Sequence, residues 1–428
     1  MWTKIKQNLA DAKLFLTYTF LGSISKALGA VLPLVVAKIL SPAQFGSYSL
    51  GKMLIFFFSA LTISSIQRPF IVFANEELNQ SGKIAKSFTI KFFFVIASLI
   101  VGGLLIFLFS AQIAKFAQIE NADLWAVFAG FFGFSICALI SNVFMGLNQR
   151  IKSILVDLFY NLFATVIIIF LYLTGNITIK SCLNVYFYAM LGIIGCFIWQ
   201  IDYRKLLPMQ FDLHHLNKLF DFTKWIFLGV TASYFINWGD NLILRYYVSM
   251  EDIGHYNFAY QISKTIIFLT ATIYFYFLPF IIQNINDKKK ITHYLDSKRP
   301  KIFILGLCGL VIVYFLAPYL IELVYGESYR KSEQILRLLL ISNLVNLYVV
   351  FLPAIYEALR FYKSLNMIAI IQIILNLLLD FILIPWLGIA GAAIATNIGY
   401  LAMAAMMEWH FRKHVLNGLK NETQRNID

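Results

Sequence analysis

Apolar runs of about 20 residues recur along the whole of this 428-residue chain, and they limit its possible folds more than any other feature. Each run can cross a hydrocarbon core of about 30 Å as an α-helix. Only 13% of the residues are charged and 60% are hydrophobic, unlike a water-soluble domain. We therefore expect an all-α polytopic membrane protein with about twelve spans. These are residues 14–40, 42–67, 88–110, 124–147, 153–174, 179–200, 222–247, 250–283, 302–321, 334–358, 365–387 and 389–411.

Lys and Arg residues are concentrated in alternate loops between these spans. With a cytoplasmic N-terminus, inside segments hold 25 of the 35 Lys and Arg residues and outside segments hold 7. This bias follows the positive-inside rule and predicts that both termini are cytoplasmic. Because the charges alternate rather than form one patch, the net charge of +13 does not indicate a nucleic acid partner.

Two short segments repeat one pattern at an offset of 208 residues. Residues 41–48 and 249–256 both read Ser, three variable residues, an apolar residue, Gly, a variable residue and Tyr. Ser41 and Ser249 are suitable N-caps, so each segment should begin a helix. The repeat predicts two six-span halves in parallel duplication, although one helix-start solution could also have arisen twice. The expected divisions are an N-terminal bundle at 1–205, a cytoplasmic linker at 206–221, a C-terminal bundle at 222–411 and a tail at 412–428.

Lys26, Lys52 and Lys264 lie inside predicted spans, where each lysine would cost roughly 2.5–3.5 kcal/mol if it faced lipid. Polar residues at helical spacing share a face with them. We predict that these lysines and Arg68 line a polar cavity. The other expected lining residues are Ser23, Asn237, Asn241, Asn257, Gln261 and Asn376. The alternatives are a static pairing of Lys264 with an aspartate, and an interfacial anchor for Arg68.

Asp240, Glu357 and Asp380 are the carboxylic acids within the later spans. A carboxyl group in a span that can gain and lose a proton is a common element of ion coupling. We therefore consider proton or sodium coupling at these residues, with a salt-bridge role as the equal alternative. No cofactor and no metal are expected, because no metal-ligand or nucleophile–base spacing is visible.

Three segments resemble the Wzx-type polysaccharide flippases of the MATE-like, or MOP, transporter superfamily. They are residues 40–48, then Asp240 and Asn241 with residues 253–260, and residues 376–396. The resemblance implies two six-helix bundles in a V shape related by a pseudo-two-fold axis. It also implies transport by alternating access of an undecaprenyl-diphosphate-linked oligosaccharide, such as an O-antigen unit of lipopolysaccharide, to the outer leaflet of a bacterial inner membrane. Cationic residues of relatives at the positions of Lys26, Lys52 and Lys264 hold the diphosphate, and other polysaccharide-assembly proteins would be partners.

Two other functions are considered. A MATE-like multidrug exporter would share the fold, but a carrier of cationic drugs should have acidic groups in its first half, where the spans offer Lys26 and Lys52. A membrane-embedded polysaccharide polymerase or glycosyltransferase should present a large outer loop or an acidic, His-rich site, which this chain lacks. We therefore expect a transporter and not an enzyme.

Overall fold

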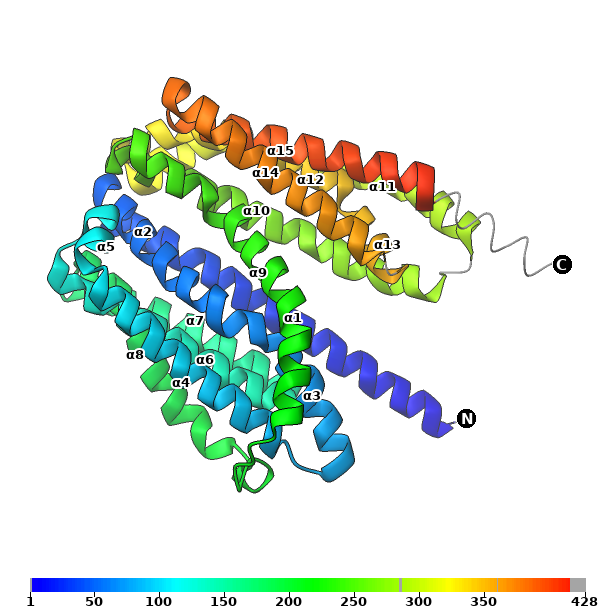
Figure 1. Ribbon diagram of the computed structural model, residues 1–428. Helices are drawn as coiled ribbons and strands as arrows, with labels where there is room; N and C mark the ends of the chain where they lie inside the picture. Colours follow the sequence, from blue (N-terminus) through cyan, green and yellow to red (C-terminus); the bar gives the residue numbers. More distant parts are fainter. Residues whose placement is uncertain (1, 285–286, 360, 416–428) are drawn as a thin grey trace. The chain divides into compact units, whose positions relative to one another are not determined.

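The computed structural model describes residues 2–284, 287–359 and 361–415, and these residues contain helices and no strand (Figure 1). The α-helices are α1 (Trp2–Ile39), α2 (Pro42–Ser59), α3 (Ser65–Ser81), α4 (Ala85–Leu108), α5 (Ser110–Ala117), α6 (Leu124–Gly146), α7 (Arg150–Leu173), α8 (Ile179–Phe197), α9 (Leu213–Tyr247), α10 (Met250–Gln283), α11 (Lys288–Tyr325), α12 (Lys331–Val349), α13 (Phe351–Ala358), α14 (Tyr362–Leu387) and α15 (Ile389–His410). The described residues also contain two π-helical segments, η1 (Ala60–Ser64) and η6 (Phe411–Val415). They contain four 3₁₀ turns as well: η2 (Asn121–Asp123), η3 (Ile198–Gln200), η4 (Tyr203–Lys205) and η5 (Glu327–Tyr329).

Within the described residues, nine helices are long and apolar enough to cross a membrane, or eleven if each of two bent pairs is one span. One bent pair is α12 with α13, which are inclined by 42°. Helix α10 is not among these eleven candidates, but it coincides with the expected span at 250–283. Each of the twelve expected spans therefore lies on helical segments of the structure. The all-α polytopic fold predicted from the apolar runs is confirmed.

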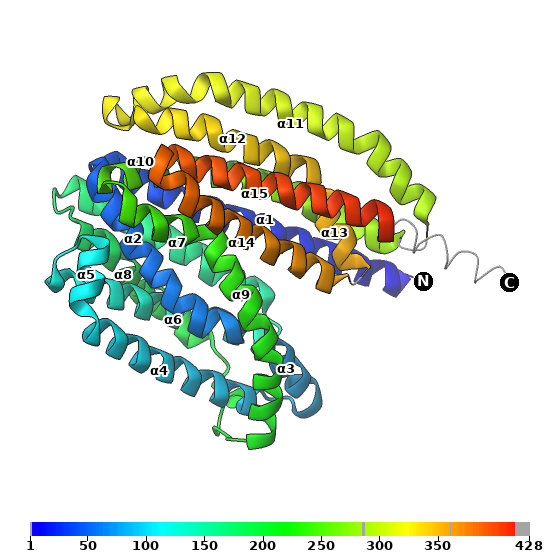
Figure 2. The same ribbon diagram turned by 45° about the horizontal axis from the view of Figure 1, so that its top comes forward.

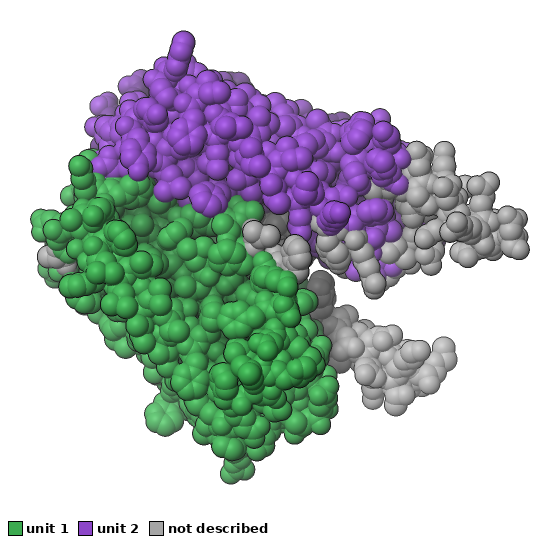
Figure 3. Space-filling model, viewed as in Figure 1, with its two compact units in different colours: residues 1–234 green, residues 235–428 purple. Residues whose placement is uncertain are grey.

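The chain divides into two compact units, residues 1–234 and 235–428, coloured separately in Figure 3. The long helix α9 contributes to both units. The duplication and the linker boundaries expected from the repeat stay predictions.

The helix starts expected from the repeat are confirmed. The Ser41 hydroxyl accepts the backbone N–H of Gln44 at 3.3 Å, the Gln44 side chain accepts the N–H of Ser41 at 3.1 Å, and Pro42 is the first residue of α2. At the start of α10, the Ser249 hydroxyl accepts the N–H of Asp252 at 3.1 Å. Both caps satisfy N–H groups that the helix itself leaves unpaired.

In the first unit, α6 packs against α2, α3, α4, α7 and α8. Small residues allow this crowding. A Cβ atom on Gly133 of α6 would lie 2.4 Å from the carbonyl oxygen of Tyr186 in α8, which is closer than any side chain can approach. Close backbone approach at small residues is the usual packing of helices in lipid.

A π-helical segment interrupts the second span. Helix α2, η1 and α3 form one 40-residue helical segment, Pro42–Ser81. Around η1, hydroxyl groups bond back to carbonyl oxygens four residues earlier, from Ser59 to Ile55 at 2.7 Å and from Ser65 to Leu61 at 3.2 Å. Side chains that bond back in this way loosen and bend helices.

In the second unit, α12 packs against α10, α11 and α15, and α14 packs against α15. Gly388 turns the chain between α14 and α15 with a φ of +58°, which an L-residue rarely adopts. A Cβ on Gly391, one turn later, would lie 2.4 Å from the Leu383 carbonyl oxygen. The turn therefore depends on glycine at both positions, and it brings Thr396 of α15 back alongside α14.

Candidate functional site

Lys264 lies in α10 with its charge held by neutral groups. Its Nζ donates to Oδ1 of Asn237 in α9 at 2.6 Å and lies 5.9 Å from the centre of the Tyr260 ring. The side chain is half-buried, and no carboxylate pairs with it among the described residues. The alternative of a static pairing with Asp240 or Asp380 therefore has no support among these residues. A half-buried ammonium without a counter-charge is suited to an anion.

The two lysines of the first unit differ in exposure. Lys52 of α2 is half-buried, with its Nζ 5.8 Å from the centre of the Phe56 ring. Lys26 of α1 is exposed. It lies beside a contact between α1 and α7, in which Nδ2 of Asn161 donates to the hydroxyl of Ser25 at 3.2 Å. The convergence of Lys26 and Lys52 with Lys264 stays a prediction.

Arg68 is exposed on α3. It follows Pro42 by 26 residues in the continuous helical segment, about 39 Å at 1.5 Å per residue. This length exceeds a hydrocarbon core of about 30 Å. The position favours the interfacial anchor over the cavity for Arg68.

A buried polar cluster joins four helices of the second unit. Oδ2 of Asp240 in α9 accepts the Tyr256 hydroxyl of α10 and the Thr396 hydroxyl of α15, the latter at 3.2 Å. With its amide oriented to satisfy both atoms, Asn376 of α14 donates to Oδ1 of Asp240 at 3.1 Å and accepts the N–H of Thr396 at 3.2 Å. The carboxyl of Asp380, one turn along α14 from Asn376, lies near that of Asp240, and the two groups interact electrostatically.

Asp380 is the least satisfied member of this cluster. Its side chain is fully buried, and neither carboxyl oxygen has a hydrogen-bond donor among the described groups. Two adjacent buried carboxylates with no cation would repel each other, so a shared proton or a bound cation must reduce their charge. This cluster offers oxygen atoms that can share a proton or bind a hard cation such as sodium. They belong to Asp240, Asp380, Asn376 and Thr396.

Of the remaining predicted lining residues, Asn241, Asn257 and Ser23 make hydrogen bonds within or between helices. Nδ2 of Asn257 donates to Oδ1 of Asn241 at 2.6 Å and joins α10 to α9. Gln261 is half-buried, and the exposed Ser23 bonds back to the Thr19 carbonyl at 2.9 Å. Asn241 and Asn257 hold together the helices that carry Asp240 and Lys264.

Glu357 does not join the aspartate pair. It lies in α13 and accepts the hydroxyl of Tyr274 at 2.5 Å. Tyr274 follows Tyr256 by 18 residues in α10, about 27 Å along the helix. The three in-span carboxyls thus separate into one pair and one distant group.

Lys91 has a role that its sequence position did not indicate. It is one of the 25 cations assigned to inside segments, but its side chain is fully buried in α4, and its Nζ donates to the Ile63 carbonyl oxygen of η1 at 3.0 Å. The assignment to a loop is wrong because nearness to a span end does not show on which face a lysine lies. The only available signal was its place three residues inside the predicted span 88–110.

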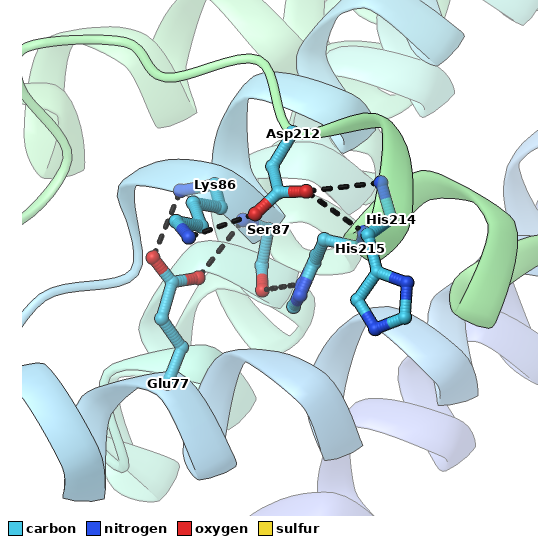
Figure 4. A network of polar contacts seen from close by, with 6 residues as sticks. All are labelled: Glu77, Lys86, Ser87, Asp212, His214 and His215. Atoms are coloured by element: carbon cyan, nitrogen blue, oxygen red, sulfur yellow. Dashed lines mark hydrogen bonds and ion pairs between the residues drawn. The ribbon is translucent and has the colours of Figure 1, made fainter.

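A second polar network, shown in Figure 4, joins the α3–α4 turn to the start of α9. The Glu77 carboxylate accepts the backbone N–H groups of Lys86 and Ser87, both at 2.9 Å, and so caps α4. Carboxylates are favoured at this position because they pair with free N–H groups and with the positive end of the helix dipole.

The same arrangement recurs at the start of α9. Oδ1 of Asp212 accepts the N–H groups of His214 and His215 at 3.0 and 3.1 Å, and its Oδ2 pairs with the Lys86 ammonium at 2.8 Å. The Ser87 hydroxyl and Nε2 of His215 are 2.9 Å apart. The bond from Lys86, followed by those from the two N–H groups, lowers the pKa of Asp212 to about 2. The chain that enters α9 is thus fixed to α4.

Residues 35–334 match the sequence model of a family described as "Polysaccharide biosynthesis protein". Among curated proteins, the chain is 19% identical over 227 residues to the "Probable low-salt glycan biosynthesis flippase Agl15" of Haloferax volcanii, covering 52% of this chain and 48% of that protein. It is 29% identical over 142 residues to the "Capsular polysaccharide biosynthesis protein CapF" of Staphylococcus aureus, covering 32% and 35%. The chain thus spans half or less of the length of these relatives.

Solved structures share the fold over almost the entire chain. The lipid II flippase MurJ in an inward closed conformation superimposes with a TM-score of 0.74 at 16% identity, covering 94% of this chain and 87% of that one. An inward-facing multidrug resistance MATE transporter of the MOP superfamily gives 0.71 at 13% identity, covering 94% and 96%. The MATE-like fold expected from the sequence is confirmed.

Proposed function

This chain belongs to the polysaccharide biosynthesis protein family, and on that premise we propose that it is a flippase that moves a lipid-linked glycan across the membrane. Its relatives and structural neighbours are named as flippases and transporters, which agrees with a transporter rather than an enzyme. Nine helices of the described residues, or eleven if each bent pair is one span, are long and apolar enough to cross a membrane, which supports a multi-pass membrane protein.

The environment of Lys264 is the observation that supports an anionic cargo. The Lys264 ammonium lies within a predicted span and is half-buried, with an amide oxygen and a tyrosine ring beside it and no carboxylate paired with it among the described residues. A charge of this kind is costly in a membrane unless water or an anion accompanies it. An anionic headgroup that passes Lys264 would supply the missing counter-charge.

The cargo we propose is an undecaprenyl-diphosphate-linked oligosaccharide, moved from the cytoplasmic to the outer leaflet of a bacterial inner membrane by alternating access. Lys26, Lys52 and Lys264 would contact the diphosphate in turn or together. A diphosphate that enters hydrocarbon loses its hydration, and fixed cations lower that barrier by replacing the water. The glycan would stay in the polar cavity and the prenyl tail in lipid, with both termini of the protein in the cytoplasm.

We further propose that the Asp240–Asp380 pair couples transport to a proton or sodium gradient. The pair is buried, and Asp380 has no hydrogen-bond donor within the part of the chain that the structure describes. Uptake of one positive charge would remove the repulsion and pull α9 and α14 together, whereas release would loosen them. Glu357, held by Tyr274 at a distance, has no part in this step.

The test of the cargo is a flipping assay with purified protein in liposomes that contain a short undecaprenyl-diphosphate-linked glycan. Lys264→Gln should lower the flipping rate about tenfold or more, because a hydrogen bond to a charged group contributes roughly 1.5–3 kcal/mol. Lys264→Arg should retain most of the rate. Lys301→Gln, an exposed lysine of α11, is the matched control and should be neutral. A wild-type rate for Lys264→Gln would contradict the proposal.

A multidrug exporter is the second candidate, and the buried aspartate pair together with the fold of MATE transporters favours it. A carboxylate pair can bind an organic cation as well as a proton. The same liposomes, loaded with a cationic dye in place of the glycan, separate the two functions. Dye efflux without glycan flipping would assign the chain to drug export.

A further inference from the structure

A groove of about 500 Å³ lies between α11 and α12, which run side by side in Figure 2. Its walls include Leu310, Val311 and Tyr314 from α11 and Gln334, Arg337 and Ile341 from α12. The volume lies in the range of small-ligand sites, about 300–1,000 Å³. One cation and mostly apolar side chains therefore share one groove.

The groove belongs to the part of the second unit that is exposed to the membrane. Only 17% of the most apolar stretch of α11 is buried, the lowest share among the candidate spans of the described residues. Val311 is 45% exposed and Ile341 46% exposed. A span with apolar side chains directed outward contacts lipid tails, so lipid has direct access to the groove.

The positive charge of Arg337 is not paired with a carboxylate among the described residues. Its guanidinium lies 4.9 Å from the centre of the Tyr314 ring, and its Nε is buried with no hydrogen-bond partner. An arginine within a span costs roughly 2.5–3.5 kcal/mol on insertion scales unless a partner is present.

We propose that this groove binds an anionic phospholipid, with its phosphate on Arg337 and one acyl chain along Leu310, Val311 and Ile341. The charge is complementary, because one guanidinium matches one phosphodiester and has two nitrogen edges to offer it. Tyr314 fixes the guanidinium plane, and Gln334, three residues before Arg337 on the same face of α12, supplies an amide to headgroup oxygens.

The depth of Arg337 suits this role. It follows the start of α12 by six residues, about 9 Å along the helix. A long arginine side chain at that depth can extend toward the interface, where lipid phosphates lie. The site is separate from Lys264 and independent of the glycan cargo, since it faces lipid and needs no transport cycle.

The experiment is lipid binding to the purified, delipidated full-length chain, measured by native mass spectrometry and by the shift in Tm. The probes are phosphatidylglycerol and phosphatidylcholine with identical acyl chains. Wild-type protein should retain phosphatidylglycerol and gain stability with it, and Arg337→Gln should weaken that binding at least tenfold, with Arg337→Lys intermediate. Ile341→Trp, which fills the apolar part, should weaken binding of both lipids.

Arg330→Gln is the matched control, because Arg330 is an exposed arginine just before α12 and outside the groove. It should bind phosphatidylglycerol like wild type. Equal retention of both lipids by wild type, or unchanged phosphatidylglycerol binding by Arg337→Gln, would overturn the proposal. Preferential binding of undecaprenyl phosphate over phosphatidylglycerol at Arg337 would also overturn it, because the groove would then belong to the carrier lipid.

Discussion

The Lys91 ammonium donates to the Ile63 carbonyl oxygen at 3.0 Å, and this bond joins α4 to the π-helical segment η1 in the middle of the second span. π-Helical turns recur at functional positions of membrane and soluble helices, where the regular backbone bonds are disturbed. Lys91 is fully buried and has no carboxylate partner among the described residues. The lysine thus supports an irregular backbone segment that begins eight residues, about two turns, after Lys52 of α2.

We expect Lys91→Met to leave the stability unchanged or to raise it slightly, while it lowers the flipping rate. The lost hydrogen bond contributes about 1–3 kcal/mol, but burying an isolated ammonium costs at least as much, and methionine has a similar shape. The measurements are the Tm in detergent and the rate in liposomes. The exposed Lys83→Met is the control and should alter neither. A fall of several degrees in the Tm of Lys91→Met would show that the bond outweighs the burial cost.

Gly133→Ala should destabilise the first unit by about 1–3 kcal/mol, because overpacking of a tight contact costs this much. The added Cβ would lie 2.4 Å from the Tyr186 carbonyl oxygen and 2.8 Å from Cα of Phe187, and backbone atoms cannot rotate away. Helices α6 and α8 must therefore separate.

Gly195→Ala in α8 is the matched control for this contact, since its Cβ would meet no atom within 4 Å. Alanine is the better helix former, so this variant should be neutral or slightly more stable. Thermal unfolding of both variants in the same detergent provides the comparison. Equal Tm values for the two would refute the close approach of α6 to α8.

The sequence predicted the features of this fold that depend on local chemistry. The length of each apolar run sets a membrane span, and the hydroxyls of Ser41 and Ser249 set the starts of α2 and α10. Both signals reside in a few consecutive residues. For this reason they could be recognised without knowledge of the packing.

The features that the sequence did not predict depend on which helix faces meet. Asp240 and Asp380 are 140 residues apart in the sequence. They are neighbours where α9 meets α14, and a Cβ on the adjacent Gly239 would lie 2.8 Å from the Leu377 side chain of α14. Lys91 is a comparable case, because it is buried by the packing of α4 against other helical segments, among them α3, α6 and η1. Periodicity identifies a polar face but does not reveal its partner.

Asp380→Asn should abolish the dependence of transport on an imposed gradient, because the amide needs no positive charge to be neutral. Wild-type liposomes should flip cargo faster with a proton or sodium gradient, whereas the variant should give the same rate with and without it. Asp240→Asn should in addition lower the Tm, since Asp240 accepts hydrogen bonds from Tyr256, Thr396 and Asn376.

Sodium can be tested apart from transport. If the pair binds sodium, the Tm of wild type should be higher in sodium chloride than in choline chloride, and Asp380→Asn should lose the difference. Glu357→Gln is the control and should respond like wild type in both assays, because Glu357 lies away from the pair. Gradient-dependent transport by Asp380→Asn would leave the aspartates as structural partners.

The ion pair between Asp212 and Lys86 should make stability depend on pH in the acid range. The pKa of Asp212 is about 2 in the folded protein and 3.8 in its ordinary state, so the carboxylate favours folding above about pH 4 and loses this effect as the pH falls toward 2. Asp212→Asn removes the charge at every pH. Its Tm should therefore be lower than that of wild type by a constant amount above about pH 4.5, and the two should converge toward pH 2. Asp221→Asn is the matched control and should follow wild type throughout, because Asp221 is exposed and pairs with Lys224, three residues away on the same helix. A difference between Asp212→Asn and wild type that persists at pH 2 would mean that Asp212 fixes the start of α9 through the shape of its side chain rather than through its charge.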